Sequence, residues 1–224
     1  MPSARIIQLR ELLSERFPNL RTHLDDAPVS GKFWPTGLPQ LDNPLGGGIS
    51  KGAFTEIISR DQNAGSATLV RALLHRAASE SQIIAFVDGA DSLDITQLDE
   101  AALTRLLWIR CRSGDEALRA TDVLLRDTNL SLLILDLINV PDAQLRRVSA
   151  TTWYRFQRLV EETATVCLVF TPRPMVSPAE ARIAIQSRFS LNALDAPGAE
   201  LLRLLKVDVS TTRQGREIAQ QNFA

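Results

Sequence analysis

The chain has 224 residues, of which 45% are hydrophobic and 23% charged, a balance typical of globular proteins that excludes wholesale disorder. This length suits one large α/β domain better than two small ones. A net charge of −1 excludes a strongly basic nucleic-acid binder by overall charge, so any DNA contact would have to come from a local patch.

The cysteines and histidines predict neither disulfide nor metal chemistry. Cys111 and Cys167 fall in apolar runs typical of strands, where a free thiol behaves as a small hydrophobe, and this indicates a reducing compartment. His23 and His75 lie apart from each other and from the cysteines, so we expect no metal site. No apolar stretch approaches the length of a membrane span, and we expect a cytoplasmic protein without membrane contact.

The first predicted element is an amphipathic helix. Its apolar residues recur at helical spacing until Pro18 ends the pattern, and a polar linker follows. We interpret residues 1–32 as a helix and linker that precede a core domain over residues 33–224. The apolar face either docks on a partner or caps the protein's own core, and the sequence leaves both alternatives open. The docking face would consist of Ile6, Leu9, Leu13 and Phe17.

Short apolar runs then alternate with helical patterns. Three glycines at residues 46–48 predict a tight bend before the first long strand. Unbroken apolar strands belong in a sheet that is covered on both faces, and their alternation with helices predicts parallel strands joined by right-handed crossovers. Strands are expected at 53–58, 83–87, 106–111, 132–137 and 166–171, and helices near 68–79, 94–103, 115–125 and 143–162.

The pattern changes after Pro178. We expect a helix to follow this proline, and the segment Leu201–Val209 is then predicted to be a longer strand. Residues 212–215 predict a turn into a final short strand, so the tail is expected to form an antiparallel hairpin at the sheet edge. The expected fold is therefore an α/β fold, a mostly parallel sheet flanked by helices, with an N-terminal helix and a C-terminal antiparallel hairpin.

Residues 56–69 have the outline of a phosphate-binding loop but lack its lysine. In such a loop, backbone N–H groups wrap the phosphates, a lysine neutralises the β/γ charge and a hydroxyl holds Mg²⁺. Here Gly65-Ser66-Ala67 occupies the place of Gly-Lys-Ser/Thr. The segment is either an ordinary strand–loop–helix turn or a degenerate phosphate loop. The residues of such a degenerate loop would be Ser59, Gly65, Ser66 and Thr68.

Two predicted strands end in acidic residues. Ligands of doubly wound parallel sheets bind at the carboxyl ends of the strands, so a binding site is expected at these ends. Leu132–Asp136 has the Walker B pattern, four apolar residues and an aspartate, which would place the Asp136 carboxylate near Mg²⁺. Many parallel strands end in this way. The segment 84–94, in which Asp88 follows the apolar run, is more distinctive.

Taken in order, these segments resemble the core of the RecA superfamily. Residues 38–52 look like the approach to its first strand, 86–94 like its second strand and 113–118 like the helix start before the Walker B strand. The P-loop lysine of RecA has no counterpart here, and its catalytic glutamate falls at Ala90. Loss of both removes most of what phosphoryl transfer needs, so we expect neither enzymatic activity nor a bound cofactor.

Within that superfamily the chain is most similar to the ImuA family, RecA-like accessory proteins of bacterial mutagenic repair. The resemblance is carried by residues 52–58 with the lysine-free loop, 145–159, and 170–182. It implies a non-hydrolysing scaffold in SOS-induced mutagenic translesion DNA synthesis. The implied partners are an ImuB-like Y-family protein, an error-prone replicative-type polymerase and RecA. The alternatives are a SulA-like SOS cell-division inhibitor and a nucleotide-binding RecA-type recombinase paralogue.

Arginines are concentrated after the Walker B-like strand. Arg147, Arg155 and Arg158 are predicted to share a helix face, and together with Trp153 and Tyr154 they would follow a single DNA strand by charge and stacking. Rows of arginines are also often solvated or paired with acidic residues, so weak DNA binding and partner contact stay open. The candidate residues are Arg146, Arg147, Arg155, Arg158, Arg173, Arg182 and Arg188.

Overall fold

The computed structural model describes residues 31–60, 65–127, 129–187, 189 and 198–211. The chain divides into two compact units, Met1–Gly31 and Lys32–Ala224. Three sequence predictions lie outside the described residues: the docking helix with Ile6, Leu9, Leu13 and Phe17, the contact residue Arg188, and the turn at 212–215. No helix in the described ranges is both long and apolar enough to cross a lipid bilayer.

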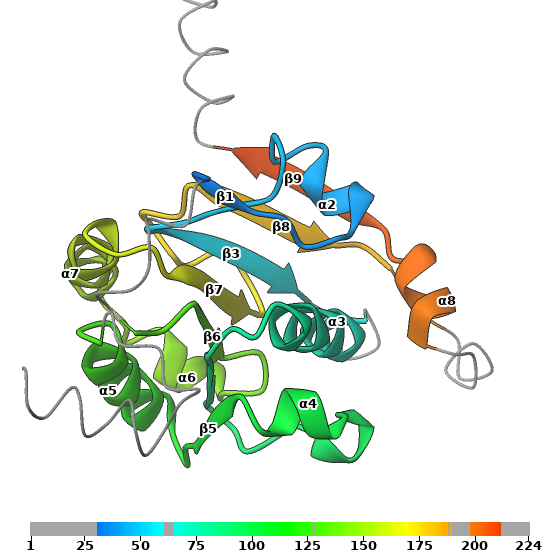
Figure 1. The fold of residues 1–224 in the computed structure, drawn as a ribbon. Coiled ribbons are helices and arrows are strands. Elements are labelled where there is room, and N and C mark those ends of the chain that lie inside the picture. Colours follow the sequence, from blue (N-terminus) through cyan, green and yellow to red (C-terminus); the bar gives the residue numbers. More distant parts are fainter. Residues whose placement is uncertain (1–30, 61–64, 128, 188, 190–197, 212–224) are drawn as a thin grey trace, which may run out of the picture. The chain divides into compact units, whose positions relative to one another are not determined.

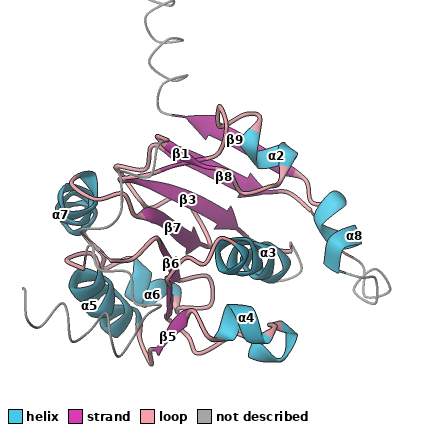
Figure 2. Ribbon diagram, viewed as in Figure 1, coloured by secondary structure: helices cyan, strands magenta, loops and turns pink. Residues whose placement is uncertain are grey.

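A seven-stranded sheet forms the centre of the second unit in its described part (Figures 1 and 2). The strand order is β5-β4-β6-β7-β3-β8-β9; all neighbours pair in parallel except β8 and β9, which are antiparallel. This confirms the predicted α/β fold and the antiparallel pair near the C-terminus. The strands are β3 (Ala53–Ser59), β4 (Ile84–Asp88), β5 (Leu106–Arg110), β6 (Leu132–Asp136), β7 (Val166–Thr171), β8 (Ala181–Ile185) and β9 (Val207–Thr211).

Helices cover both faces of this sheet (Figure 1). Helix α3 (Ser66–Ser79) packs on one face, where Ile57 and Phe86 of the strands point. Helices α5 (Gly114–Leu124) and α7 (Ala150–Glu161) pack on the other face, where Phe54 points. Because the central strands are buried on both sides, they read as unbroken apolar runs rather than as alternating ones.

The predicted long helix over residues 143–162 is wrong, because the segment forms two helices. Helix α6 (Asp142–Leu145) ends before Arg146, and α7 begins only after Ser149. The Ser149 hydroxyl accepts a hydrogen bond from the backbone N–H of Thr152 at 3.3 Å, the usual cap of a helix start. Arg147 therefore lies in the connection and does not share a helix face with the arginines of α7.

Three further segments have a different secondary structure from the predicted one. Leu201 lies in a helix, α8 (Gly198–Arg203), because alanine, glutamate, leucine and arginine all favour helix; only β9 is a strand. The segment after Pro178 forms β8 instead of a helix, with alternating burial along the strand. Residues 94–103 form a 3-10 turn, η1 (Ile95–Gln97), and a short helix, α4 (Glu100–Leu103), instead of one helix.

A small ribbon of two strands precedes the sheet. β1 (Phe33–Trp34) and β2 (Ile49–Ser50) pair in antiparallel fashion, and α2 (Pro39–Asp42) lies between them. Trp34 is buried, and its indole N–H donates to Glu80 at 2.8 Å. The predicted tight bend is present: Gly48 has a φ of +140°, and a Cβ there would lie 2.2 Å from the Trp34 carbonyl oxygen. Only glycine therefore fits at residue 48, where the bend passes close to the backbone of Trp34.

Candidate functional site

The loop with the phosphate-binding outline leads into α3. Gly65 adopts a left-handed conformation, with φ of 93°, directly before Ser66, the first helical residue. A Cβ on Gly65 would lie 2.6 Å from Cε2 of Phe189 and 3.0 Å from Cδ1 of Leu205. A helix N-terminus binds anions through exposed backbone N–H groups. At this helix an aromatic ring and a leucine methyl group fill the space beside the glycine that precedes it.

The segment that contributes Leu205 is anchored at several points. Leu205 itself is buried. The backbone N–H of Lys206 donates to the Ser187 hydroxyl at 2.6 Å, and the side-chain amide of Gln40 donates to the Leu202 carbonyl at 2.9 Å. Leu205 therefore belongs to the hydrophobic core on the α3 side of the sheet, and Phe189 packs against that core.

The other predicted loop residues lie close by. Ser59 is buried at the carboxyl end of β3, and Ser66 and Thr68 are half-buried in the first turn of α3. Residues 61–64 lie outside the described ranges. The structure therefore brings the predicted loop residues to one end of α3, together with the Phe189 and Leu205 side chains, for which the sequence has no signal.

Two aspartates end neighbouring strands in register, Asp88 on β4 and Asp136 on β6. The pKa of Asp136 is raised to about 6, mainly by burial; the hydrogen bond from the Ile138 N–H opposes this rise, and the nearby Asp88 charge adds to it. That hydrogen bond to Oδ1 is 3.0 Å long. Among the described residues no group of three or more His, Cys, Asp or Glu is arranged to hold a metal ion.

Asp88 is fully buried and already has several donors. It accepts hydrogen bonds from the backbone N–H groups of Ser92 at 2.9 Å and Leu93 at 2.8 Å, and from the indole N–H of Trp108 at 3.3 Å. Such donors stabilise a buried carboxylate and hold the loop after β4 in one conformation. The sequence indicated this segment as distinctive, and the structure gives Asp88 the role of fixing the loop.

Glu56 is a buried acid that the sequence analysis did not single out. It is fully buried in β3, and its Oε1 accepts hydrogen bonds from the Thr171 hydroxyl at 3.1 Å and from the N–H groups of Met175 and Val176 at 2.6 and 3.0 Å. Its Oε2 accepts from Arg182 Nε at 2.8 Å. A charged residue in the middle of an apolar strand is tolerated only with such partners. The position of Glu56 within an apolar run is therefore the sequence feature that could have indicated this network.

This network fixes the connection between β7 and β8. Arg182, one of the predicted contact arginines, also donates from Nη2 to the Val176 carbonyl at 2.8 Å. Met175 and Val176 are thereby held to β3 through Glu56, and Val176 is also held to β8 through Arg182. The connection between these two strands is therefore attached to the sheet near its middle.

Two of the predicted arginines meet at one carboxylate. Arg146 Nε lies 2.6 Å from Oδ2 of Asp142, and Arg173 Nε lies 3.1 Å from Oδ1. Hydrogen bonds from Arg146 and then Arg173 lower the pKa of Asp142. The pairing places two guanidinium groups around a single negative charge, so this small cluster has a net positive charge. The cluster of Arg146, Arg173 and Asp142 is called the arginine pair below.

The remaining predicted arginines are elsewhere. Arg155 on α7 pairs with Asp122 on α5, at 3.3 Å between Nη2 and Oδ1, and its guanidinium lies 5.4 Å from the ring centroid of Phe156. Arg147 and Arg158 are exposed. The predicted arginines therefore do not form one continuous row in the described part of the chain.

The order of the strands and the helices on both faces define a RecA-like α/β protein. The structure of the RadB recombinase aligns with a TM-score of 0.53 and 17% identity, covering 67% of this chain and 81% of that one. The sequence matches show that the chain is homologous to RecA-superfamily proteins across about half of its length. No family model matches the chain.

The curated relatives that match are RecA proteins. RecA of Nitratidesulfovibrio vulgaris strain DP4 is 30% identical over 126 residues, 54% of this chain and 35% of that protein. RecA of Bdellovibrio bacteriovorus is 31% identical over 115 residues, 49% of this chain and 30% of that protein. RecA of Tropheryma whipplei is 34% identical over 119 residues, 50% of this chain and 26% of that protein. The matched segments thus span about a third or less of the RecA chains.

Proposed function

We propose that this chain is a non-hydrolysing RecA-like accessory protein, an ImuA-like scaffold in SOS-induced mutagenic translesion DNA synthesis. In this role it binds an ImuB-like Y-family protein, an error-prone replicative-type polymerase and RecA, and it acts by contact alone. Homology to RecA and the RecA-like fold support the class. The lysine-free loop and the residues beside Gly65 support the loss of nucleotide chemistry.

The contact of Phe189 and Leu205 with Gly65 carries the proposal. To bind a nucleoside triphosphate, a phosphate loop needs accessible backbone N–H groups and a cation beside the β- and γ-phosphates. Beside Gly65 the chain instead places two apolar side chains. Its only lysines are Lys32, Lys51 and Lys206, so none lies in the loop. An apolar contact without a cation disfavours a phosphate group at this position.

The residue at the position of the catalytic glutamate also supports the loss of nucleotide hydrolysis. Ala90 occupies the place of the catalytic glutamate that the resemblance implies, and its methyl group has no hydrogen-bonding capacity. Its backbone N–H points to Asp88 Oδ1 at 3.4 Å. Asp88 in turn accepts hydrogen bonds from its own loop. Ala90 therefore supplies no general base at this position, and Asp88 serves to hold its loop.

The fixed connection after β7 favours a scaffold role. Glu56 and Arg182 attach Met175 and Val176 to the sheet by hydrogen bonds, and Arg173 lies two residues before this anchored point and pairs with Asp142. A rigid surface loses little conformational entropy when a partner binds. The arginine pair is then a surface for an acidic partner segment or for the phosphates of a single DNA strand.

A nucleotide-binding measurement on the full chain tests the proposal. Calorimetric titration with ATP and Mg²⁺ should show no saturable binding in the micromolar range. Saturable, Mg²⁺-dependent binding that is lost in Asp136→Asn would overturn the proposal and favour the nucleotide-binding recombinase alternative.

The scaffold role needs a second measurement, because loss of ATP binding alone does not identify partners. The tagged full chain should co-purify with the Y-family-like protein and the replicative-type polymerase from cells with damaged DNA. Filamentous growth on overexpression, without such co-purification, would instead favour the SulA-like alternative.

A further inference from the structure

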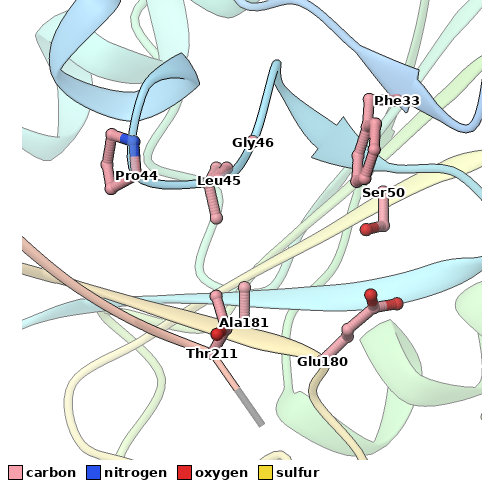
Figure 3. A pocket seen from close by; sticks show the side chains of 8 residues that line it. All are labelled: Phe33, Pro44, Leu45, Gly46, Ser50, Glu180, Ala181 and Thr211. Carbon is pink, nitrogen blue, oxygen red and sulfur yellow. The ribbon is translucent and has the colours of Figure 1, made fainter. Parts of the chain in front are cut away.

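The two edges of the central sheet are covered differently. At the β9 edge, helix α2 packs against the strand. Figure 3 shows Phe33 and Ser50 of the β1–β2 ribbon across a cavity from Ala181 and Thr211 at the same edge. β5 ends the sheet on the other side, where no described strand pairs with its outer edge. Such an open edge is a template for pairing with another chain.

Two hydrogen bonds show which backbone groups of β5 point away from the sheet. The Ile84 N–H donates to the Arg105 carbonyl at 3.0 Å, and the Cys111 N–H donates to the Asp88 carbonyl at 2.8 Å. The backbone groups of successive strand residues point to opposite edges. Every second residue from Arg105 to Cys111 therefore faces β4. The residues whose N–H and C=O groups face outward are Leu106, Trp108 and Arg110.

The side chains of β5 do not protect this edge. Leu107 is 49% exposed, because α5 packs against β4 and leaves the outer strand uncovered. Ile109 lies on the same face and is half-buried. Arg110 is bound to Asp91 at 2.7 Å between Nη2 and Oδ2, and its guanidinium lies 4.9 Å from the Trp108 ring centroid. Unpaired charges, a proline or a bulge usually protect edge strands, but β5 has a neutralised charge, no proline and regular pairing.

The strand is complementary to itself in the antiparallel direction. When two copies pair about a two-fold axis at Trp108, the outward residues of one copy meet those of the other, so their N–H and C=O groups become partnered. On the α5 side, Leu107 of one copy faces Ile109 of the second copy, which joins two apolar side chains. Arg110 faces Leu106, so no two like charges lie directly opposite each other within β5.

We propose that the chain forms a closed dimer in which β5 pairs in antiparallel fashion with β5 of a second copy, centred on Trp108. A two-fold interface uses the same strand of both copies, so assembly through this edge stops at the dimer. A second copy always presents the matching pattern, whereas an unrelated strand matches it only by chance. The dimer presents each partner-binding surface twice, which strengthens binding to a multivalent partner. This goes beyond the proposed function, which gives the scaffold no stoichiometry, and it does not depend on the loss of nucleotide binding.

Sedimentation equilibrium of the full chain tests the dimer. The wild-type protein should show a reversible monomer–dimer equilibrium, with no larger species at any concentration. Leu107→Glu should raise the dissociation constant at least about tenfold, because the two-fold axis places a carboxylate beside an apolar side chain twice. Leu204→Glu is the matched control: Leu204 is 53% exposed and lies between α8 and β9, so its substitution should leave the equilibrium unchanged.

Disulfide trapping tests the register of the two strands. A mixture of Leu107→Cys and Ile109→Cys chains, tagged differently and oxidised with diamide, should form a cross-linked dimer that contains one chain of each kind. Leu107→Cys alone should cross-link far less, since the two positions are offset diagonally, beyond the roughly 7 Å between Cα atoms that a disulfide spans. Cys111 and Cys167 are buried, so the wild-type chain is the blank. Both variants keep a small apolar side chain at the edge, so trapping decides the question even if Leu107→Glu unfolds the chain.

Any of three results would overturn the proposal. A monomer at every concentration, without disulfide trapping, would show that the β5 edge does not pair with a second copy. A dimer that Leu107→Glu leaves intact would place the interface elsewhere, for example in residues 1–31. Growth beyond the dimer, or equal trapping of Leu107→Cys alone, would indicate a different arrangement of the strands.

Discussion

Phe189 lies against Gly65 at the start of α3, so closely that a methyl group on the glycine would be 2.6 Å from the Cε2 atom of the ring. The contact joins the end of the first parallel strand to a residue that follows β8. It accounts for a glycine in the loop without any phosphate, since both the left-handed backbone and the ring require a residue that lacks Cβ.

The first prediction concerns this contact. Gly65→Ala should destabilise the protein by about 2–4 kcal/mol, which combines a strained backbone with an overpacked neighbour. Gly46→Ala is the matched control: Gly46 also has a positive φ, of +73°, but nothing lies within 4 Å of its added Cβ. It should cost about 1–2 kcal/mol. Equal losses in urea unfolding would show that the Phe189 contact is unimportant.

The second prediction concerns pH. Because the pKa of Asp136 is about 6 in the folded protein and ordinarily 3.8, the folded state binds this proton more tightly. This contribution to stability is present at low pH and is lost as pH rises through 6. Asp136→Asn should therefore stabilise the protein at pH 8 by about 1–3 kcal/mol and have little effect near pH 4. Unfolding curves showing the same difference at both pH values would contradict this.

The third prediction concerns the buried carboxylate. Glu56→Gln should destabilise the protein by about 2–4 kcal/mol, because it leaves Arg182 without its anion. Glu161→Gln, on the exposed surface of α7, should change stability by less than about 0.5 kcal/mol. Adding Arg182→Leu to Glu56→Gln should cost less than the sum of the single losses. Strict additivity would mean that the two residues are not coupled.

The fourth prediction concerns DNA. If the arginine pair binds phosphates, the affinity for labelled oligothymidylate should fall steeply as salt rises, because bound counterions are released. Arg146→Gln and Arg173→Gln should each weaken binding severalfold and reduce the salt slope by about 1. Arg155→Gln is the control, since Arg155 pairs with Asp122 on a different helix pair. An equal effect of all three would indicate a diffuse field and no defined site.

The fifth prediction concerns the N-terminal segment, which lies outside the described residues. Leu9→Ala combined with Leu13→Ala should weaken capture of the Y-family-like partner in pull-down experiments, because the predicted docking face loses its apolar area. The thermal unfolding of the core should be unchanged. Loss of the folded core would instead favour the alternative that this helix caps its own domain.

The sequence predicted the parallel sheet well, because each buried strand is an apolar run of fixed length between turn residues. Val166–Thr171 and Leu132–Asp136 are examples, the first matching its predicted range and the second ending one residue early. The errors fall where local preference and burial disagree. Leu201 is part of a leucine-rich segment that suits either a strand or a helix, and only tertiary packing decides between them.

The site was less predictable, for a different reason. Asp136 and Gly65 are recognisable from motifs that involve neighbours in sequence. Glu56 receives its hydrogen bonds from residues 115 to 126 positions away, and Phe189 meets Gly65 only after the chain has crossed the sheet. A single sequence contains no direct record of such distant pairings. The one local indication was a charged residue within an apolar strand, and it predicts partners without naming them.

The sheet order also determines when this protein can fold during synthesis. Both neighbours of β3 are made late, since β7 and β8 follow it by more than a hundred residues. At ribosomal speeds of about 5–20 residues per second, the nascent β3 waits roughly 5–20 s for its first partner. For that interval a largely apolar strand has two unpaired edges, and unpaired edges are prone to pair with other chains.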